Sequence, residues 1–219
     1  VELSADMVIR ENAFPQACDI HPGYQQPQIN YPESGAVGFI INENVFRIGN
    51  PEAVLDLYVK LLDKLLNDGE KVYILNTSTA DFHLVEKVLA KVKRRDRVGV
   101  ISGEYSSPEL IDIIGRFKYV VASRYHSVVF AYRSGVPAII LGWASKYVDL
   151  AAHFQQQDYV FDIRDPGVDQ ILKQVEKMGA NNEIESQRIS ECLANMQMTS
   201  VIQDALGALE RIGPTAAAA

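Results

Sequence analysis

The chain has 219 residues, of which 47% are hydrophobic and 22% are charged, as in an ordinary globular protein of one large or two small domains. Its formal net charge of −7 argues against a nucleic-acid partner, because such proteins carry clustered excess lysine and arginine. No stretch approaches the ~18 consecutive apolar residues of a membrane-spanning helix, and the opening residues lack the features of a signal peptide.

From residue 37 onward, short apolar runs alternate with amphipathic stretches. The apolar runs predict strands at residues 37–42, 71–76, 97–102, 119–123, 136–143 and 159–163. The stretches between them predict helices at 51–69, 79–95, 107–117, 125–135 and 146–154. Strands that are apolar along their whole length are typical of parallel sheets covered on both faces. The sequence therefore predicts an α/β fold with a doubly wound, parallel, Rossmann-like sheet.

We expect this sheet to form one domain over residues 36–165. Residues 1–35, rich in Pro, Gln and Asn, predict a strand followed by a linker. Residues 166–212 show helical patterns without strands and predict two helices that pack back on the domain. Residues 213–219, "GPTAAAA", predict a disordered or artificial tail.

Polar groups follow several of the predicted strands, where ligands of an open α/β sheet bind. These groups lie at residues 42–44, 76–78, 102–104 and 123–127. The last of them, "SRYHS", places Arg124 and His126 between a strand and a helix, and Lys146 follows the next strand. If those two strands are neighbours, the three side chains meet beside the positive end of the helix that begins near Tyr125. Such a cluster predicts a site for a phosphate, a carboxylate or both.

Each of these residues also has an ordinary structural interpretation. Arg124 could pair with Glu109 or Asp112, His126 could be a packed histidine, and Lys146 could be a surface lysine. Their shared position at one edge of the sheet favours the anion site.

Several familiar catalytic patterns are missing from the sequence. It contains neither GxGxxG nor GxxxxGK[ST], which disfavours a classical NAD or P-loop protein, and no GxSxG elbow of a serine hydrolase. The four histidines and two cysteines have no metal-ligand spacing. We therefore expect no metal at the site.

The stretch "YSSPELIDIIGRFKYVVASRYHSVVFAYRSGVPAIILGWASKYVDL" (105–150) resembles the C-terminal signature of polysaccharide pyruvyl transferases. The shared features are an SPEL-like helix start (107–110), an Arg-x-His element after a strand (Arg124, His126), a Gly-Val-Pro helix end (135–137) and a lysine after the next strand (Lys146). The opening "SADMVIRE" is similar to the strand that closes the family's N-terminal half. The resemblance thus implies the C-terminal half of a glycosyltransferase-B-like, two-domain enzyme.

The resemblance also implies an activity. The enolpyruvyl group of phosphoenolpyruvate would be transferred to a sugar diol of a polysaccharide or glycan precursor, giving a pyruvate ketal and phosphate, without a metal or other cofactor. Arg124 would bind the carboxylate or phosphate, His126 would bind phosphate or act as general acid, and Lys146 would neutralise the departing phosphate. The implied substrate-binding residues are Arg124, Tyr125, His126, Ser127, Lys146, Trp143, Asn76, Thr77 and Glu109. For Glu109, completion of a helix cap that starts at Ser107 is an equally good explanation.

Two other functions stay open at this point. A nucleotide-sugar-dependent glycosyltransferase of the same fold would use the cations for a diphosphate, and Glu104 or Glu109 for a ribose. A non-catalytic glycan- or anion-binding module would stack sugar rings on Tyr125, Trp143 or Tyr147. In every case we expect a cytoplasmic protein, at the inner face of the membrane where exopolysaccharide precursors are assembled, with a glycan or lipid-linked sugar as acceptor. The sequence leaves the acceptor, its general base and any homo-oligomer undetermined.

Overall fold

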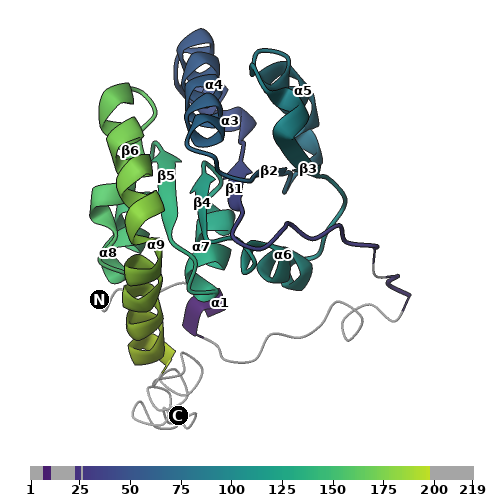
Figure 1. The fold of residues 1–219 in the computed structure, drawn as a ribbon. Helices are drawn as coiled ribbons and strands as arrows, with labels where there is room; N and C mark the ends of the chain where they lie inside the picture. Colours follow the sequence, from purple (N-terminus) through teal and green to yellow (C-terminus); the bar gives the residue numbers. More distant parts are fainter. Residues whose placement is uncertain (1–6, 11–22, 26, 198–219) are drawn as a thin grey trace, which may run out of the picture.

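The computed structural model of the chain describes residues 7–10, 23–25 and 27–197. Its centre is a parallel sheet in the order β3-β2-β1-β4-β5-β6 (Figure 1). The strands are β1 Val37–Ile40, β2 Val72–Leu75, β3 Val98–Ile101, β4 Tyr119–Ala122, β5 Ala138–Gly142 and β6 Val160–Asp162. The predicted doubly wound α/β fold is therefore confirmed. The strand order reverses between β1 and β4, and such a switch point is where open α/β sheets bind ligands.

Helices cover both faces of the sheet (Figure 1). Buried side chains of α3, α4, α5 and the first half of α9 form one hydrophobic core with the sheet, and those of α6, α7, α8 and the second half of α9 form the other. The helices are α3 Glu43–Ile48, α4 Pro51–Asn67, α5 Phe82–Leu89, α6 Ser107–Ile114, α7 Tyr125–Arg133, α8 Ser145–His153 and α9 Val168–Gln197, with 3₁₀ turns η1 Thr79–Asp81, η2 Arg95–Arg97 and η3 Gln157–Tyr159. This two-sided burial explains why the strands are apolar throughout.

Helix α4 shows how local sequence sets an element. The side chain of Asn50 accepts hydrogen bonds from the amides of Glu52 and Ala53, and Pro51 occupies the first turn, where no amide hydrogen is needed. Its apolar side chains recur at helical spacing, and eight of its residues are buried. The helix ends before Gly69, whose φ of +84° favours glycine.

Helix α9 passes from one helical layer to the other at the amino ends of the strands, opposite the end at which the pocket lies. Ile171 and Met178 belong to the core beside α4, whereas Ile189 belongs to the core beside α7. Between them, Ser186 donates a hydrogen bond to the carbonyl of Gly135, just before β5. The sequence predicted two helices over 166–212; α9 is one continuous helix to residue 197, and residues 198–212 and the expected tail lie outside the described residues.

Three predictions about single elements are wrong. Residues 7–10 form the short helix α1 (Met7–Arg10), packed on α7 and α9, and not a strand. The helix predicted at 79–95 is the turn η1 followed by α5, which ends at Leu89, where the amides of Lys91 and Val92 bond to the carbonyls of Val88 and Leu89, three residues back and not four. The N-cap of α6 is Ser106 and not Ser107.

Candidate functional site

A pocket of about 230 Å³ opens at the switch point, among the loops that follow β1, β2, β4 and β5. Strands β4 and β5 are neighbours, so the condition for bringing Arg124 and Lys146 together is met. The lining residues are Asn42, Asn44, Thr77, Leu110, Arg124, Tyr125, His126, Ser127, Phe130, Trp143, Lys146 and Tyr147. Seven of the nine predicted site residues line this pocket. The exceptions are Asn76 and Glu109.

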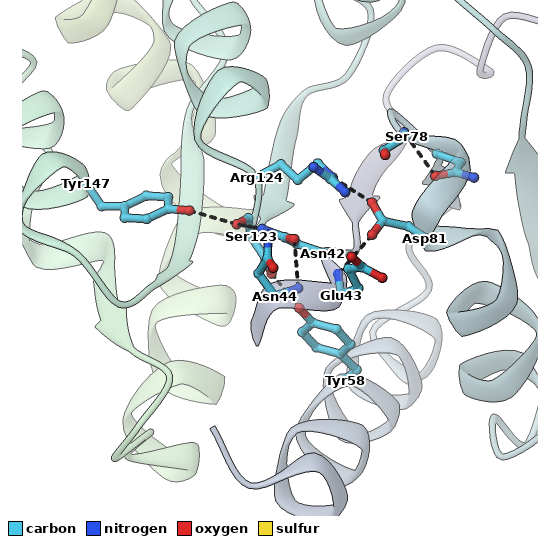
Figure 2. Close-up of polar contacts among 10 residues, drawn as sticks. Asn42, Glu43, Asn44, Tyr58, Ser78, Asp81, Ser123, Arg124 and Tyr147 are labelled. Carbon is cyan, nitrogen blue, oxygen red and sulfur yellow. Dashed lines mark hydrogen bonds and ion pairs between the residues drawn. The ribbon is translucent and has the colours of Figure 1, made fainter. Parts of the chain in front are cut away.

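Arg124 is held by a buried carboxylate that sequence reasoning missed. Its Nε donates to Oδ2 of Asp81 over 2.6 Å, and the Asp81 side chain is only 1% exposed (Figure 2). The ion pair is therefore real, but its partner is neither Glu109 nor Asp112. Within the described part of the chain, the terminal Nη1 and Nη2 of Arg124 have no hydrogen-bond partner. These nitrogens are the donors that Arg124 can offer to a ligand.

Asp81 also connects the loops after β1 and β2. Its Oδ1 accepts a 2.9 Å hydrogen bond from the backbone amide of Glu43, the first residue of α3. Asp81 precedes α5 at the N-cap position, where aspartate commonly binds amides of its own helix and contributes about 1 kcal/mol. Here it makes no such bond. Only its position in a polar loop after a strand could have pointed to it.

The backbone at Ser123 is fixed from both layers (Figure 2). Its carbonyl accepts hydrogen bonds of 3.0 Å from Nδ2 of Asn42 and from the hydroxyl of Tyr147, and its Oγ shares a hydrogen bond with the hydroxyl of Tyr58. Burial raises the pKa of Tyr147 to about 12, although the nearby Arg124 cation opposes this shift. The Tyr147 phenol therefore stays a donor at any physiological pH, and the residue before Arg124 is rigidly placed.

Aromatic rings form one wall of the pocket. Tyr125 packs edge-on against Tyr147, with centroids 5.6 Å apart, and Trp143 lies 5.6 Å from the same Tyr147 ring. The Lys146 ammonium is 4.6 Å from the centroid of the Tyr125 ring, close enough for a cation–π contact. Lys146 has no ion-pair partner among the described residues. Its charge is thus available to an anion in the pocket.

His126 lies in the first turn of α7 with an exposed side chain. Its ring contacts the rings of Tyr125 and Phe130, at centroid distances of 5.7 and 6.4 Å. Within the described ranges its imidazole has no hydrogen-bond partner. It is not the packed, hydrogen-bonded histidine of the structural interpretation, and its nitrogens are accessible.

The two predicted residues outside the pocket lining are buried nearby. Oε2 of Glu109 accepts from the amide and hydroxyl of Ser106 and from the hydroxyl of Tyr24, so Glu109 completes the cap of α6. Asn76 follows β2, and its Oδ1 accepts from the amide of Ser78 over 3.3 Å. Its Nδ2 and the Oγ1 of the adjacent Thr77 lack partners in the described part of the structure.

The described residues contain no group of three or more His, Cys, Asp or Glu side chains able to hold a metal ion. None of the helices in the described ranges combines the length and apolar character needed to cross a bilayer. The site as built consists of a fixed guanidinium, an ammonium on an aromatic wall, an accessible imidazole and the positive end of α7. Such a set can bind a small anion and supply a proton.

Solved structures share this fold. An O-GlcNAc transferase mutant from Thermobaculum terrenum has a TM-score of 0.57 at 15% identity, covering 80% of this chain and 36% of its own. TarM has a TM-score of 0.55 at 14% identity, covering 88% and 37%, and the glycotransferase of kitacinnamycin has 0.53 at 13%, covering 91% and 47%. At these identities the likeness shows a Rossmann-like fold of the glycosyltransferase-B kind. The chain spans less than half the length of each of these proteins.

Sequence comparison identifies the family. No curated protein matches the chain. A sequence model described as polysaccharide pyruvyl transferase matches residues 1–145, which include the strands β1 to β5 and ten of the twelve residues that line the pocket, but not Lys146 or Tyr147. This match covers more than half of the 219 residues. The chain therefore belongs to the polysaccharide pyruvyl transferase family.

Proposed function

We propose that this chain binds phosphoenolpyruvate in the pocket at the switch point and takes part in transferring its enolpyruvyl group to a sugar diol. The acceptor is a glycan or lipid-linked precursor, and the reaction takes place in the cytoplasm, at the inner face of the membrane. Phosphoenolpyruvate carries a carboxylate and a phosphate on a three-carbon frame. Two separate anions on a small molecule suit two separate cations, Arg124 and Lys146, in one small pocket.

The presence of two cations, Arg124 and Lys146, in one pocket is the observation that carries this proposal. The volume of about 230 Å³ lies below the range of ~300–1,000 Å³ that is usual for drug-sized ligands. A three-carbon donor fits within such a volume, and its two anionic groups match the two cations that line the pocket. The likeness to glycosyltransferases concerns the fold alone and does not favour their donor.

The chemistry follows from the donor and balances without a metal or a redox partner. A proton is added to the methylene carbon of phosphoenolpyruvate, which becomes a methyl group, and a sugar hydroxyl oxygen attacks the neighbouring carbon, which has gained carbocation character. That hydroxyl loses its proton. The bond between this carbon and the phosphate oxygen then breaks, and the second hydroxyl attacks the same carbon, its proton leaving with the phosphate. The products are a pyruvate ketal and inorganic phosphate.

Three side chains take the roles that their positions allow. Arg124 binds the carboxylate or phosphate through its terminal nitrogens, and Lys146 stabilises the charge that develops on the departing phosphate. His126, accessible in the first turn of α7, donates the proton or binds the phosphate. The general base for the acceptor is not assigned to any residue of this chain.

Calorimetric titration with phosphoenolpyruvate tests the proposal. Removing the Arg124 side chain would leave the buried Asp81 carboxylate unpaired, at a cost of ~3–5 kcal/mol, so Arg124→Ala would confuse folding with binding. Arg124→Lys keeps the charge beside Asp81 but lacks the terminal fork. We expect the wild-type chain to bind phosphoenolpyruvate, and Arg124→Lys to bind it at least ~10-fold more weakly through loss of a charged hydrogen bond.

A matched substitution controls for loss of any guanidinium. Arg116→Lys alters an exposed arginine that pairs with Asp112 on α6 and does not line the pocket, so its affinity should equal that of the wild type. Binding of a nucleotide sugar in place of phosphoenolpyruvate would overturn the proposed donor. Loss of binding or turnover on addition of a chelator would contradict the proposed independence of the reaction from metals.

A further inference from the structure

We propose that Asp81 is a positioning residue for the donor site: it holds Arg124 by Nε, so that the anion is bound only by the terminal nitrogens of the guanidinium. This inference rests on the proposed function. Asp81 does not line the pocket and does not touch the ligand in this scheme. It acts through Arg124 alone.

The first argument is the choice of hydrogen-bond donors to the two carboxylate oxygens of Asp81. Its position before α5 would allow a cap of its own helix, yet no such bond forms. Oδ2 instead accepts from Nε of Arg124, 43 residues away, and Oδ1 accepts from the amide of Glu43, 38 residues away (Figure 2). Asp81 therefore links the loops after β1, β2 and β4, which are the loops on both sides of the switch point.

The second argument is the geometry left to Arg124. A guanidinium can meet a carboxylate or phosphate side-on, with Nε and one Nη, or end-on, with both Nη nitrogens. Asp81 occupies Nε, which leaves the end-on arrangement. With the Ser123 carbonyl fixed by Asn42 and Tyr147, both the backbone and the far end of the Arg124 side chain are held before a ligand arrives. Such preorganisation lowers the entropic cost of binding.

The third argument is that stability alone is a poor reason to keep this pair. A buried carboxylate and its cation lose their hydration, and a well-packed apolar pair is often as stable. Asp81 is fully buried, whereas Arg124 remains a quarter exposed and lines the pocket. The pair thus joins a desolvated anion to a cation at the surface of a binding site, which is the arrangement expected of a positioning role.

The structure offers a matched control for the experiment. Glu70 and Lys118 form a second long-range, partly buried ion pair at 2.5 Å, just before β2 and β4. Asp81 and Arg124 form theirs just after the same two strands. Asp81→Asn and Glu70→Gln therefore neutralise ion-paired carboxylates at opposite ends of β2 and β4, the two strands that flank β1. Both changes should lower the melting temperature, and only the first should change donor binding.

The closing experiment is titration of the wild-type chain and both variants with phosphoenolpyruvate. We expect Asp81→Asn to weaken binding about 10-fold, because an Arg124 side chain that is no longer held would lose about one charged hydrogen bond to the donor. Glu70→Gln should leave the affinity unchanged. Equal affinity of Asp81→Asn and the wild type would overturn the inference while the proposed function stands. If the wild type does not bind phosphoenolpyruvate, the proposed function fails, and inorganic phosphate becomes the probe for the same comparison. Silence toward phosphate as well would overturn the inference too.

A second measurement does not depend on any ligand or on the folding of a variant at position 81. In ¹⁵N-labelled protein, the Nε–H signal of Arg124, assigned by its disappearance in Arg124→Lys, should exchange slowly with water because it is bonded to a buried carboxylate. An Arg124 signal that exchanges as fast as that of the exposed Arg116 would show that the pair does not hold in solution, and would overturn the inference.

Discussion

At the scale of single residues, His126 is the side chain whose role is least fixed by its surroundings. Its imidazole is exposed, and no described residue accepts or donates a hydrogen bond to it. An imidazole in this state can serve as a proton donor or as a phosphate ligand. The two roles separate in kinetics, because a proton donor acts in the transition state whereas an anchor acts in the bound ground state as well.

His126→Asn should lower kcat by ~100-fold or more and weaken donor binding much less, because asparagine keeps a hydrogen-bonding group but cannot supply the proton. Steady-state kinetics of the complete enzyme, with donor titrations beside them, measure both quantities. His153→Asn is the control, since His153 is an exposed histidine at the end of α8 that does not line the pocket. Equal losses in turnover and affinity for His126→Asn would assign it to binding and not to proton transfer.

Residue types and their place after strands were enough to predict most of the pocket lining, but not the contact that holds it. Arg124, His126 and Lys146 could be found because each follows or flanks an apolar run. Asp81 could not, because its partner is 43 residues away and the choice among Asp81, Glu109 and Asp112 depends on strand order. Asn42 and Asn44 stood in a polar loop after a strand, but nothing local distinguished them from other loop residues.

At the scale of elements, the end of a strand can lie so close to a helix that the volume of one side chain decides how the two pack. Gly142 ends β5, and a Cβ at that residue would lie 2.6 Å from the ring of Tyr147. That ring is 1% exposed and donates its hydroxyl to the Ser123 carbonyl, so it has little freedom to move. The packing of one glycine therefore affects the backbone that precedes Arg124.

Gly142→Ala should lower the free energy of unfolding by ~1–3 kcal/mol through overpacking, and should also weaken phosphoenolpyruvate binding by displacing Tyr147. Chemical denaturation and calorimetry measure the two effects. Gly23→Ala provides the control, because its new Cβ would meet no atom within 4 Å. Unchanged donor binding in a destabilised Gly142→Ala variant would mean that the Tyr147 contact does not influence the site.

The end of α5 and the type of α1 were both predicted wrongly, for physical reasons that the structure shows. Apolar residues at helical spacing predicted a helix over 79–95, but backbone hydrogen bonds change to three-residue spacing after Leu89, and the amide of Lys93 then bonds to Asp63 on α4. The apolar residues near the start of the chain suited a strand or a helix equally. Packing decided for α1, since Ile9 is fully buried against helices and not at a sheet edge.

At the scale of the whole molecule, the doubly wound architecture followed from apolar strands alternating with amphipathic helices, but the strand order did not. The order 3-2-1-4-5-6 depends on which hydrophobic faces meet, and β1, β2, β4 and β5 are all apolar enough to lie at a central position. This order is what brings β1 beside β4, and so places Asn42, Asp81 and Arg124 at one switch point. Sequence pattern thus predicted the edge of the sheet at which the pocket lies, and topology determined which residues meet there.

Buried tyrosine side chains are distributed over the whole molecule and make its stability sensitive to alkaline pH. Burial is the main cause that raises the pKa of five fully buried tyrosines, Tyr58, Tyr119, Tyr132, Tyr147 and Tyr159. In the unfolded chain these phenols ionise near pH 10, whereas in the folded chain they stay protonated. The unfolded state therefore loses protons first, and the free energy of unfolding falls as the pH rises above 10.

Each such tyrosine removes about 1.4 kcal/mol per pH unit between its unfolded and folded pKa, so five together remove about 7 kcal/mol per unit, against a typical total of ~5–15 kcal/mol. We expect cooperative unfolding between about pH 10 and 12, with the phenolate absorbance of these five tyrosines rising together with the loss of circular dichroism. Tyr132→Phe should move the midpoint to higher pH, because the Tyr132 hydroxyl is buried without a partner among the described residues. Ionisation of all ten tyrosines near pH 10 while the fold persists would contradict the burial of these five side chains.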